Sequence, residues 1–249
     1  MFIKGVNNMN MLIPVLTLSI IGMIIQGIFI AIEHKDRFVA AAVLKGTAAM
    51  IFVIIGFIGY RNFLASYGAS NTDATQGLTK NVCLMIWLGL VFGMAGDVLL
   101  ALRFVFKEKL HKFFLSGILI FFIGHIFYMI AIIPMSVNLV KCIIAGAINA
   151  FILLIVIYKT MDVKPAFQIF GLFYIEAVVI MTAIAIGNRI AVDSAFRTWY
   201  AVGAVLFTVS DVVMIFNTFG KTQKFFLRIM NLSLYYVGQL LIAASIFFV

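Results

Sequence analysis

The chain has 249 residues, of which 65% are hydrophobic and only 11% are charged, and its mean hydropathy is +1.19. These values exclude a water-soluble globular domain, in which about half of the residues are apolar and about a quarter are charged. The formal net charge of +9 does not indicate a nucleic-acid partner, because Lys and Arg lie in short gaps between apolar runs and form no basic block.

Apolar runs long enough to cross a bilayer recur eight times along the chain. A spanning helix needs about 20 apolar residues, and backbone groups in hydrocarbon must pair within their own segment, so each run is predicted to be a helix. The predicted helices cover residues 11–32, 38–60, 82–103, 112–133, 138–158, 166–187, 197–219 and 225–248. We therefore predict an all-α polytopic membrane protein, with residues 1–249 forming a single transmembrane domain of eight helices in one bundle.

Turn residues and gaps mark the ends of these helices. Pro14 is expected in the first turn of the first helix, Pro134 at the end of the fourth, and Pro165 at the first position of the sixth. The first run is too long for a signal-peptide core and lacks a small-residue cleavage site, so it is expected to be retained. The only long gap, residues 61–81, is rich in Ser, Thr, Asn and Gly and is predicted to be an external loop.

Basic residues predict the orientation in the membrane. Eleven Lys and Arg residues fall on one side of the predicted bundle and six on the other, while Lys45 lies inside a span. Cytoplasmic loops carry the excess of positive charge, so both termini are expected outside the cytoplasm. Residues 103–112 then form a basic cytoplasmic loop that can meet the anionic headgroups of membrane lipids.

A repeated pattern links the two halves of the chain. Asp97 is followed after 28 residues by His125, and Asp211 is followed after 28 residues by Gln239. This spacing suggests a possible 4+4 parallel repeat about an axis along the membrane normal.

Three ionisable residues are predicted at similar depth inside the spans. From the rise per residue, Lys45, Asp97 and Asp211 lie about 10, 9 and 12 Å from the cytoplasmic ends of their helices. Charged groups at such depth cost at least ~2.5–3.5 kcal/mol, so those present usually face the bundle interior. We expect a polar pocket that opens toward the cytoplasmic leaflet and closes near the midplane. Its other candidate residues are His125, Tyr128, Tyr174, Glu176, Tyr235, Tyr236 and Gln239.

Structural interpretations compete with functional ones for these residues. Lys45 with one Asp could be an ion pair that only joins helices, but a second buried acid favours a functional site. His125, Gln239 and the tyrosines are also typical of interhelical hydrogen bonding, and the role of Glu176 is open. No metal-type spacing is present. Cys83 and Cys142 are expected to be free buried thiols, although their positions near helix ends on one side leave a disulfide open.

The order of these residues resembles that of the YhhN-type membrane proteins, whose characterised members are lysoplasmalogenases. The resemblance runs from the second helix to the eighth. It rests on Lys45, Gly96-Asp97-Val98-Leu99-Leu100, Phe113 with Gly117, Gly124-His125 with Tyr128, Phe207 with Ser210-Asp211, and Tyr235-Tyr236 with Gln239.

The resemblance implies hydrolysis of the vinyl ether bond of a lysophospholipid substrate, a lysoplasmalogen, without a metal or cofactor. That chemistry needs an acid that protonates carbon and a nearby anion that stabilises the resulting oxocarbenium ion. Asp97 and Asp211 are the candidate catalytic residues, in either order. Lys45 is expected to favour ionisation of the acid it approaches or to bind the phosphate. The candidate supporting residues are Lys45, His125, Tyr128, Tyr174, Glu176, Ser210, Tyr235, Tyr236 and Gln239.

Two other classes of function place ionisable groups within spans. A proton-coupled transporter is the main alternative, although transporters often break helices near the midplane and neither Pro nor a double Gly does so here. A non-catalytic lipid-binding protein is the other.

Overall fold

The computed structural model describes residues 2–67, 74–161, 163 and 165–249. Eight long helices in this part of the chain are each apolar and long enough to cross a membrane, and the prediction of an all-α integral membrane protein with eight spans is confirmed. The long helices are α1 (Phe2–Glu33), α2 (Phe38–Tyr67), α3 (Ala74–Val105), α4 (Leu110–Ile132), α5 (Leu139–Thr160), α6 (Pro165–Ala191), α7 (Ala195–Phe219) and α8 (Phe225–Ser245). Short 3₁₀ turns are η1 (Lys107–Lys109), η2 (Ile133–Met135) and η3 (Ile246–Phe248).

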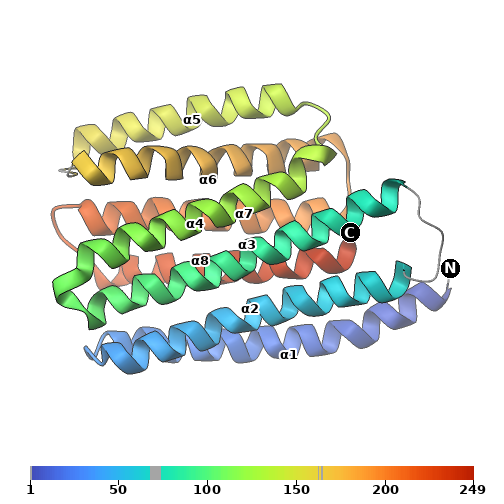
Figure 1. Ribbon diagram of the computed structural model, residues 1–249, viewed down its shortest axis with the longest axis horizontal. Coiled ribbons are helices and arrows are strands. Elements are labelled where there is room, and N and C mark those ends of the chain that lie inside the picture. Colours follow the sequence, from blue (N-terminus) through green and yellow to red (C-terminus); the bar gives the residue numbers. More distant parts are fainter. Residues whose placement is uncertain (1, 68–73, 162, 164) are drawn as a thin grey trace.

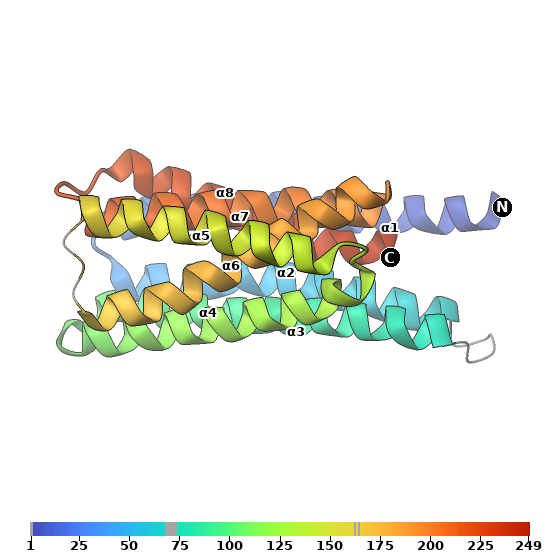
Figure 2. The same cartoon turned by 90° about the horizontal axis from the view of Figure 1, so that it is seen from above.

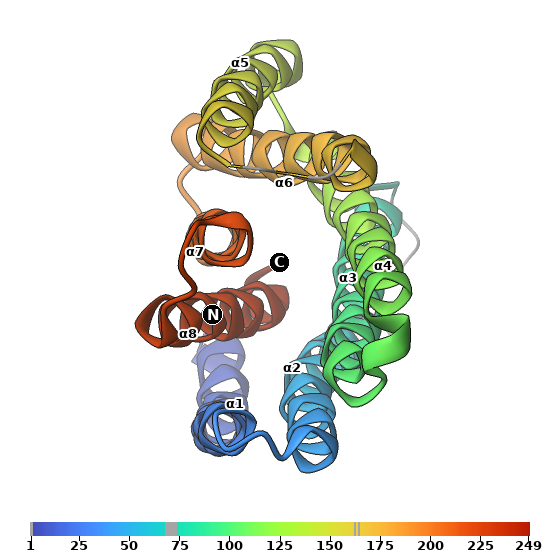
Figure 3. The ribbon, with the colours of Figure 1, turned by 90° about the vertical axis from the view of Figure 1, so that its left-hand side faces the viewer.

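Six of the helices form a closed ring. Each of α2, α3, α4, α6, α7 and α8 packs on the next in that order, and α8 packs back on α2. In the view along the bundle, α3 and α4 face α7 and α8 across the interior, while α1 and α5 lie at the periphery (Figure 3). Each outer helix packs on the helix that follows it in the chain, α1 on α2 and α5 on α6, as a parallel four-helix repeat would place them.

The helices run side by side along the bundle, so the connections between them lie at its two ends (Figure 2). Both termini lie at one end (Figure 1). The opposite end holds the α1–α2, α3–α4 and α7–α8 connections, and we call it the basic end because Lys35, Arg37, Lys107, Lys221 and Lys224 lie there.

Two expectations about helix ends are wrong. The gap over residues 61–81 is helical at 61–67 and 74–81, and only residues 68–73 lie outside the described part of the chain. Pro14 lies inside α1 rather than in its first turn. The reason is the same in both cases, because an apolar run marks the hydrocarbon layer, whereas a helix such as α2, about 45 Å long, can continue beyond that layer of roughly 30 Å. Pro134 and Pro165 lie where predicted, just after α4 and at the start of α6.

Glycines bring two pairs of helices into close contact. At Gly203 of α7, a Cβ atom would lie 2.8 Å from the carbonyl oxygen of Gly238 in α8, so the two backbones touch there. At Gly96 of α3, a Cβ would lie 2.6 Å from the ring of Phe121 in α4. Helices in lipid associate through such small-residue contacts, because no hydrophobic driving force acts between them. These contacts fix the walls of the interior.

Candidate active site in the membrane

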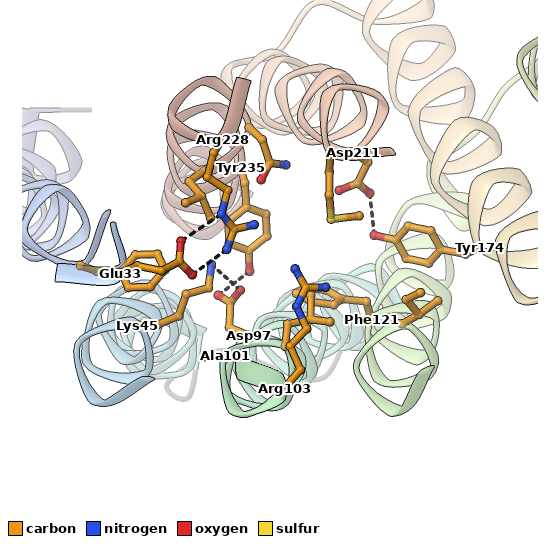
Figure 4. Close-up of a pocket in the computed structure, with 16 residues that line it drawn as sticks. Glu33, Lys45, Asp97, Ala101, Arg103, Phe121, Tyr174, Asp211, Arg228 and Tyr235 are labelled. Atoms are coloured by element: carbon orange, nitrogen blue, oxygen red, sulfur yellow. Dashed lines mark hydrogen bonds and ion pairs between the residues drawn. The ribbon is translucent and has the colours of Figure 1, made fainter. Parts of the chain in front are cut away.

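A cavity lies inside the helix ring, and 16 residues line it (Figure 4). Seven of the eight long helices contribute to its wall, and α5 is the exception. Five of the predicted site residues line it: Lys45, Asp97, Tyr174, Asp211 and Tyr235. The wall also includes Glu33, Arg103 and Arg228, which lie near the helix ends at the basic end. The cavity therefore joins the buried acids to that end of the bundle, as the sequence predicts.

Asp97 is held on both of its carboxyl oxygens. Lys45 of α2 places its Nζ 3.0 Å from Oδ1, and the Tyr235 hydroxyl of α8 donates to Oδ2 at 2.8 Å. All three side chains are buried. The ammonium group of Lys45 also lies 5.0 Å from the ring centre of Tyr235, within cation–π range. An adjacent cation and two hydrogen bonds stabilise an ionised carboxylate, so this arrangement suits Asp97 as an anion.

Asp211 has different surroundings. The Tyr174 hydroxyl of α6 donates to its Oδ2 at 2.5 Å, and Asp211 makes no ion pair within the described residues. In Figure 4, Asp211 and Tyr174 lie on one side of the cavity and Asp97 with Lys45 on the other. The two acids thus face one hollow but have separate partners. This asymmetry, one acid paired with a cation and one without, is what acid and anion roles require.

Next to Asp211, two hydrogen bonds between Ser210 and Asn231 join α7 to α8. Ser210 donates its hydroxyl to the backbone oxygen of Asn231 at 2.9 Å, and the Asn231 side-chain amide donates to the backbone oxygen of Ser210 at 2.9 Å. Asn231 lines the cavity, whereas Ser210 does not. Ser210 therefore acts on the site through the position of the helix that carries Asp211.

Other predicted site residues form a buried layer behind the cavity rather than its wall. Tyr128 donates to Oε1 of Gln239 at 2.7 Å, and Tyr236 donates to the backbone oxygen of Ala48 at 2.9 Å. The Nδ1 atom of His125 lies 2.7 Å from the backbone oxygen of Phe121, which can only accept, so Nδ1 carries the proton. None of these side chains lines the cavity, and direct contact of His125, Tyr128 or Gln239 with substrate is not supported.

His125 nonetheless contacts the wall of the cavity from behind. Its ring packs edge-on against Tyr174, the hydrogen-bond partner of Asp211, with 5.5 Å between ring centres, and against Phe207 with 4.7 Å. Its Nε2 atom and the Nε2 atom of Gln239 are buried without a hydrogen-bond partner in the described part of the chain. His125 therefore supports the position of Tyr174 rather than meeting the cavity itself.

Glu176 does not belong to the cavity. It is half-buried, does not line the hollow, and forms no hydrogen bond or ion pair with any described residue. Tyr174 does line the hollow, and two residues along a helix correspond to a rotation of about 200°, so the two side chains point in nearly opposite directions. Similar depth on one helix was therefore insufficient to group them.

The sequence analysis did not include the charged residues that line the cavity near the basic end among the candidate site residues. Arg228 forms a double contact with Glu33, through Nε at 3.0 Å and Nη2 at 2.7 Å, which joins α8 to α1. Arg103 is 8% exposed and stacks on Phe104 and Phe114. Both arginines were counted only as markers of topology. The available signal was the position of Arg103 six residues after Asp97 on the same helix.

Cys83 and Cys142 are both buried and free. The absence of a disulfide agrees with the interpretation of two separate thiols. The Cys142 sulfur packs where a side chain at Gly187 would otherwise lie, so this thiol fills space between α5 and α6. Neither cysteine lines the cavity.

Comparison with known protein families gives a match to this chain. The model of the YhhN family matches residues 63–246, a segment that contains α3 to α8 and so includes Asp97, Tyr174, Asp211 and Tyr235. Comparisons with curated proteins and with solved structures gave no match. The matched segment covers well over half of the chain. This eight-helix protein, with two buried acids facing one cavity, belongs to the YhhN family.

Proposed function

We propose that the protein is a lysoplasmalogenase, which hydrolyses the vinyl ether bond of a 1-alkenyl lysophospholipid. The products are a fatty aldehyde and glycerophosphoethanolamine or glycerophosphocholine. Membership of the YhhN family supports this function. The observation that carries it is the placement of two buried acids, Asp97 and Asp211, on the wall of one cavity, with a cation beside only one of them.

The chemistry needs a proton donor first. A vinyl ether is hydrolysed when an acid transfers a proton to the carbon beta to the ether oxygen, which leaves an oxocarbenium ion at the adjacent carbon. We assign the donor role to Asp211, because a carboxyl group buried without a cation is most stable in its neutral form. Its Oδ2 accepts from Tyr174, so the acidic proton is on Oδ1.

Asp97 is the anion in this scheme. Lys45 and Tyr235 hold it ionised, and a fixed negative charge across the cavity stabilises the oxocarbenium ion as it forms. Water then adds to the cationic carbon and returns a proton to Asp211, which restores the acid. The resulting hemiacetal collapses as its hydroxyl proton moves to the glycerol oxygen, and the C–O bond breaks to give aldehyde and alcohol.

The shape of the site suits a substrate that arrives from the membrane. The cavity extends from the buried acids to Arg103 and Arg228 near the basic end, and apolar side chains such as Phe29, Leu100 and Ile118 lie along its wall. A lysophospholipid has the same polarity gradient, with one charged headgroup and one apolar chain. We propose that the basic end faces the cytoplasm, because cytoplasmic segments carry the excess of Lys and Arg.

The proposal is tested with the purified protein in detergent. The protein is incubated with a 1-alkenyl lysophospholipid and with its saturated 1-alkyl analogue, and free aldehyde is measured. Aldehyde is expected from the alkenyl lipid alone, because the alkyl ether has no double bond to protonate. If the folded protein releases aldehyde from neither lipid, it is not a lysoplasmalogenase, and the transporter and lipid-binding alternatives then take precedence.

A further inference from the structure

Arg103 is a buried guanidinium without a carboxylate partner. The residue is 8% exposed, and its guanidinium carbon lies 4.6 and 4.7 Å from the ring centres of Phe104 and Phe114. Within the described residues it makes no ion pair and no hydrogen bond. A guanidinium has five N–H donors in a planar fork that matches carboxylate and phosphate oxygens. The two aromatic rings contact the guanidinium group but provide no hydrogen-bond acceptor for its N–H groups.

Arg228 lines the same cavity as Arg103, and not all of its N–H donors are used in contacts with Glu33. Its Nε and Nη2 atoms contact Glu33, which leaves Nη1 outside that pair. Figure 4 shows both guanidinium groups at the cavity, with Arg228 beside Glu33 and Arg103 without a dashed contact. Glu33 orients Arg228 and neutralises it. The pair of arginines therefore forms a fixed set of N–H donors with one unmatched positive charge.

The charges along the cavity leave that positive charge uncompensated. Three cations line the wall, and Lys45 and Arg228 are each paired with an acid, Asp97 and Glu33. The remaining acid, Asp211, forms no ion pair and keeps its proton in the proposed mechanism. An isolated buried charge is strongly unfavourable, so such a site calls for an anion. A phosphodiester carries one negative charge and two free oxygens.

We infer that Arg103 and Arg228 bind the phosphodiester of the lysophospholipid headgroup. This inference rests on the proposed function and adds the group that recognises the polar part of the substrate. Arg103 supplies the charge and the fork of donors, and Arg228, fixed by Glu33, supplies further N–H groups. The remainder of the headgroup extends into an adjoining hollow, which shares both arginines with the cavity and whose lining includes the polar residues Asn217 and Gln223.

The spacing between the acids and Arg103 fits this assignment. Six residues separate Asp97 from Arg103 on α3, which is an axial rise of about 9 Å toward the basic end. In a 1-alkenyl lysophospholipid, six bonds join the reacting carbon to phosphorus, and an extended chain of six bonds spans about 7 Å, as two residues of extended backbone do. With the phosphate at the guanidinium fork, the vinyl ether therefore reaches the layer of Asp97.

The test compares substrates that differ only in the phosphate. The wild-type protein and the Arg103→Gln variant are assayed with 1-alkenyl lysophospholipid and with 1-alkenylglycerol, which has the same vinyl ether but no phosphodiester. Arg103→Gln is expected to raise KM for the lysophospholipid about tenfold or more with kcat nearly unchanged, because a charge-assisted contact is lost. Turnover of 1-alkenylglycerol is expected to remain the same in both proteins.

Two matched variants separate a binding role from a structural one. Arg103→Lys keeps the charge but not the planar fork, so its KM is expected to lie between those of wild type and Arg103→Gln. Lys112→Gln removes a positive charge from the same end at an exposed position outside the cavity wall, and no change in KM is expected. If Arg103→Gln lowers kcat/KM equally for the lysophospholipid and for 1-alkenylglycerol, the phosphate assignment is overturned.

A binding measurement keeps this inference separate from the catalytic proposal. Calorimetric titration of the wild-type protein in detergent uses two inert ligands, saturated 1-alkyl lysophospholipid and 1-alkylglycerol. Tighter binding of the phosphate-bearing lipid, lost in Arg103→Gln, supports the site even if no aldehyde forms and the enzyme proposal fails. Equal affinity of the wild type for both ligands overturns the site. Inorganic phosphate that displaces the lipid at equal concentration overturns its assignment to a lipid headgroup.

Discussion

The hydroxyl of Tyr174 on α6 donates a 2.5 Å hydrogen bond to Asp211 on α7. On the other side of the cavity, Lys45 on α2 lies 3.0 Å from Asp97 on α3. Each acid is thus held by a residue of the preceding helix, at equivalent places in the two halves of the chain, but one partner is neutral and the other is a cation. This difference divides two like residues into the proposed acid and anion.

Asp211→Asn and Asp97→Asn are each expected to lower kcat for aldehyde release by about 10²- to 10⁴-fold, the usual contribution of a general acid or a fixed charge. The matched control is Glu176→Gln, which alters another acid within a span but outside the cavity wall. The measurement is aldehyde formation at saturating lipid. Full turnover in both Asp variants would show that other residues carry the reaction.

Tyr174→Phe is expected to lower kcat about three- to tenfold with little change in KM, because one hydrogen bond that orients Asp211 is lost. Tyr158→Phe serves as its control, since Tyr158 donates to the backbone oxygen of Gln168 away from the cavity. Steady-state kinetics give kcat and KM for the wild type, Tyr174→Phe and Tyr158→Phe. A rise in KM alone would place Tyr174 in substrate binding instead of acid orientation.

Lys45→Met is expected to destabilise the protein by roughly 3–5 kcal/mol, because removal of one partner leaves Asp97 buried without its cation. The double variant Lys45→Met with Asp97→Asn is expected to recover much of that stability without regaining activity, since the unpaired charge is gone but so is the anion. Thermal unfolding in detergent measures the first effect and the aldehyde assay the second. Additive losses of stability would mean that the two residues are not coupled.

Reaction in D₂O is expected to place one deuterium on the carbon next to the aldehyde group, because the acid transfers a solvent-exchangeable proton to carbon. Mass spectrometry of the aldehyde, after reduction to the alcohol to prevent further exchange, gives the count. The matched control is unlabelled aldehyde incubated with the protein in D₂O. Aldehyde without deuterium at that carbon would exclude the proposed protonation step.

Gly203→Ala is expected to destabilise the bundle by roughly 1–3 kcal/mol, because its Cβ would lie 2.8 Å from the backbone oxygen of Gly238 and neither backbone can yield easily. Gly27→Ala is the control, since a Cβ there meets nothing within 4 Å, and it is expected to be neutral or to stabilise α1 by up to about 1 kcal/mol. Thermal unfolding distinguishes the two. Equal effects would remove the proposed role of the α7–α8 contact.

Local properties of the sequence were enough to predict the membrane class, the eight spans and five of the eight acidic, basic and tyrosine residues on the cavity wall. Lipid permits only internally paired backbone, so an apolar run dictates a helix without reference to its neighbours. A charged residue inside such a run is unfavourable unless it faces the bundle interior, which is why Lys45, Asp97 and Asp211 could be recognised from depth alone.

Only the tertiary structure decided which side chains pair with one another and which side of each helix lines the cavity. The rotation of each helix about its axis decides whether Lys45 contacts Asp97 or Asp211 and whether Glu176 lies beside Tyr174. A shift of one residue along a helix turns the side-chain direction by about 100°. The pair of Arg228 with Glu33 joins residues 195 positions apart. Arg103 and Arg228 looked like topology markers in the sequence, because only the packing of α3 against aromatic residues buries a guanidinium that could otherwise extend into water.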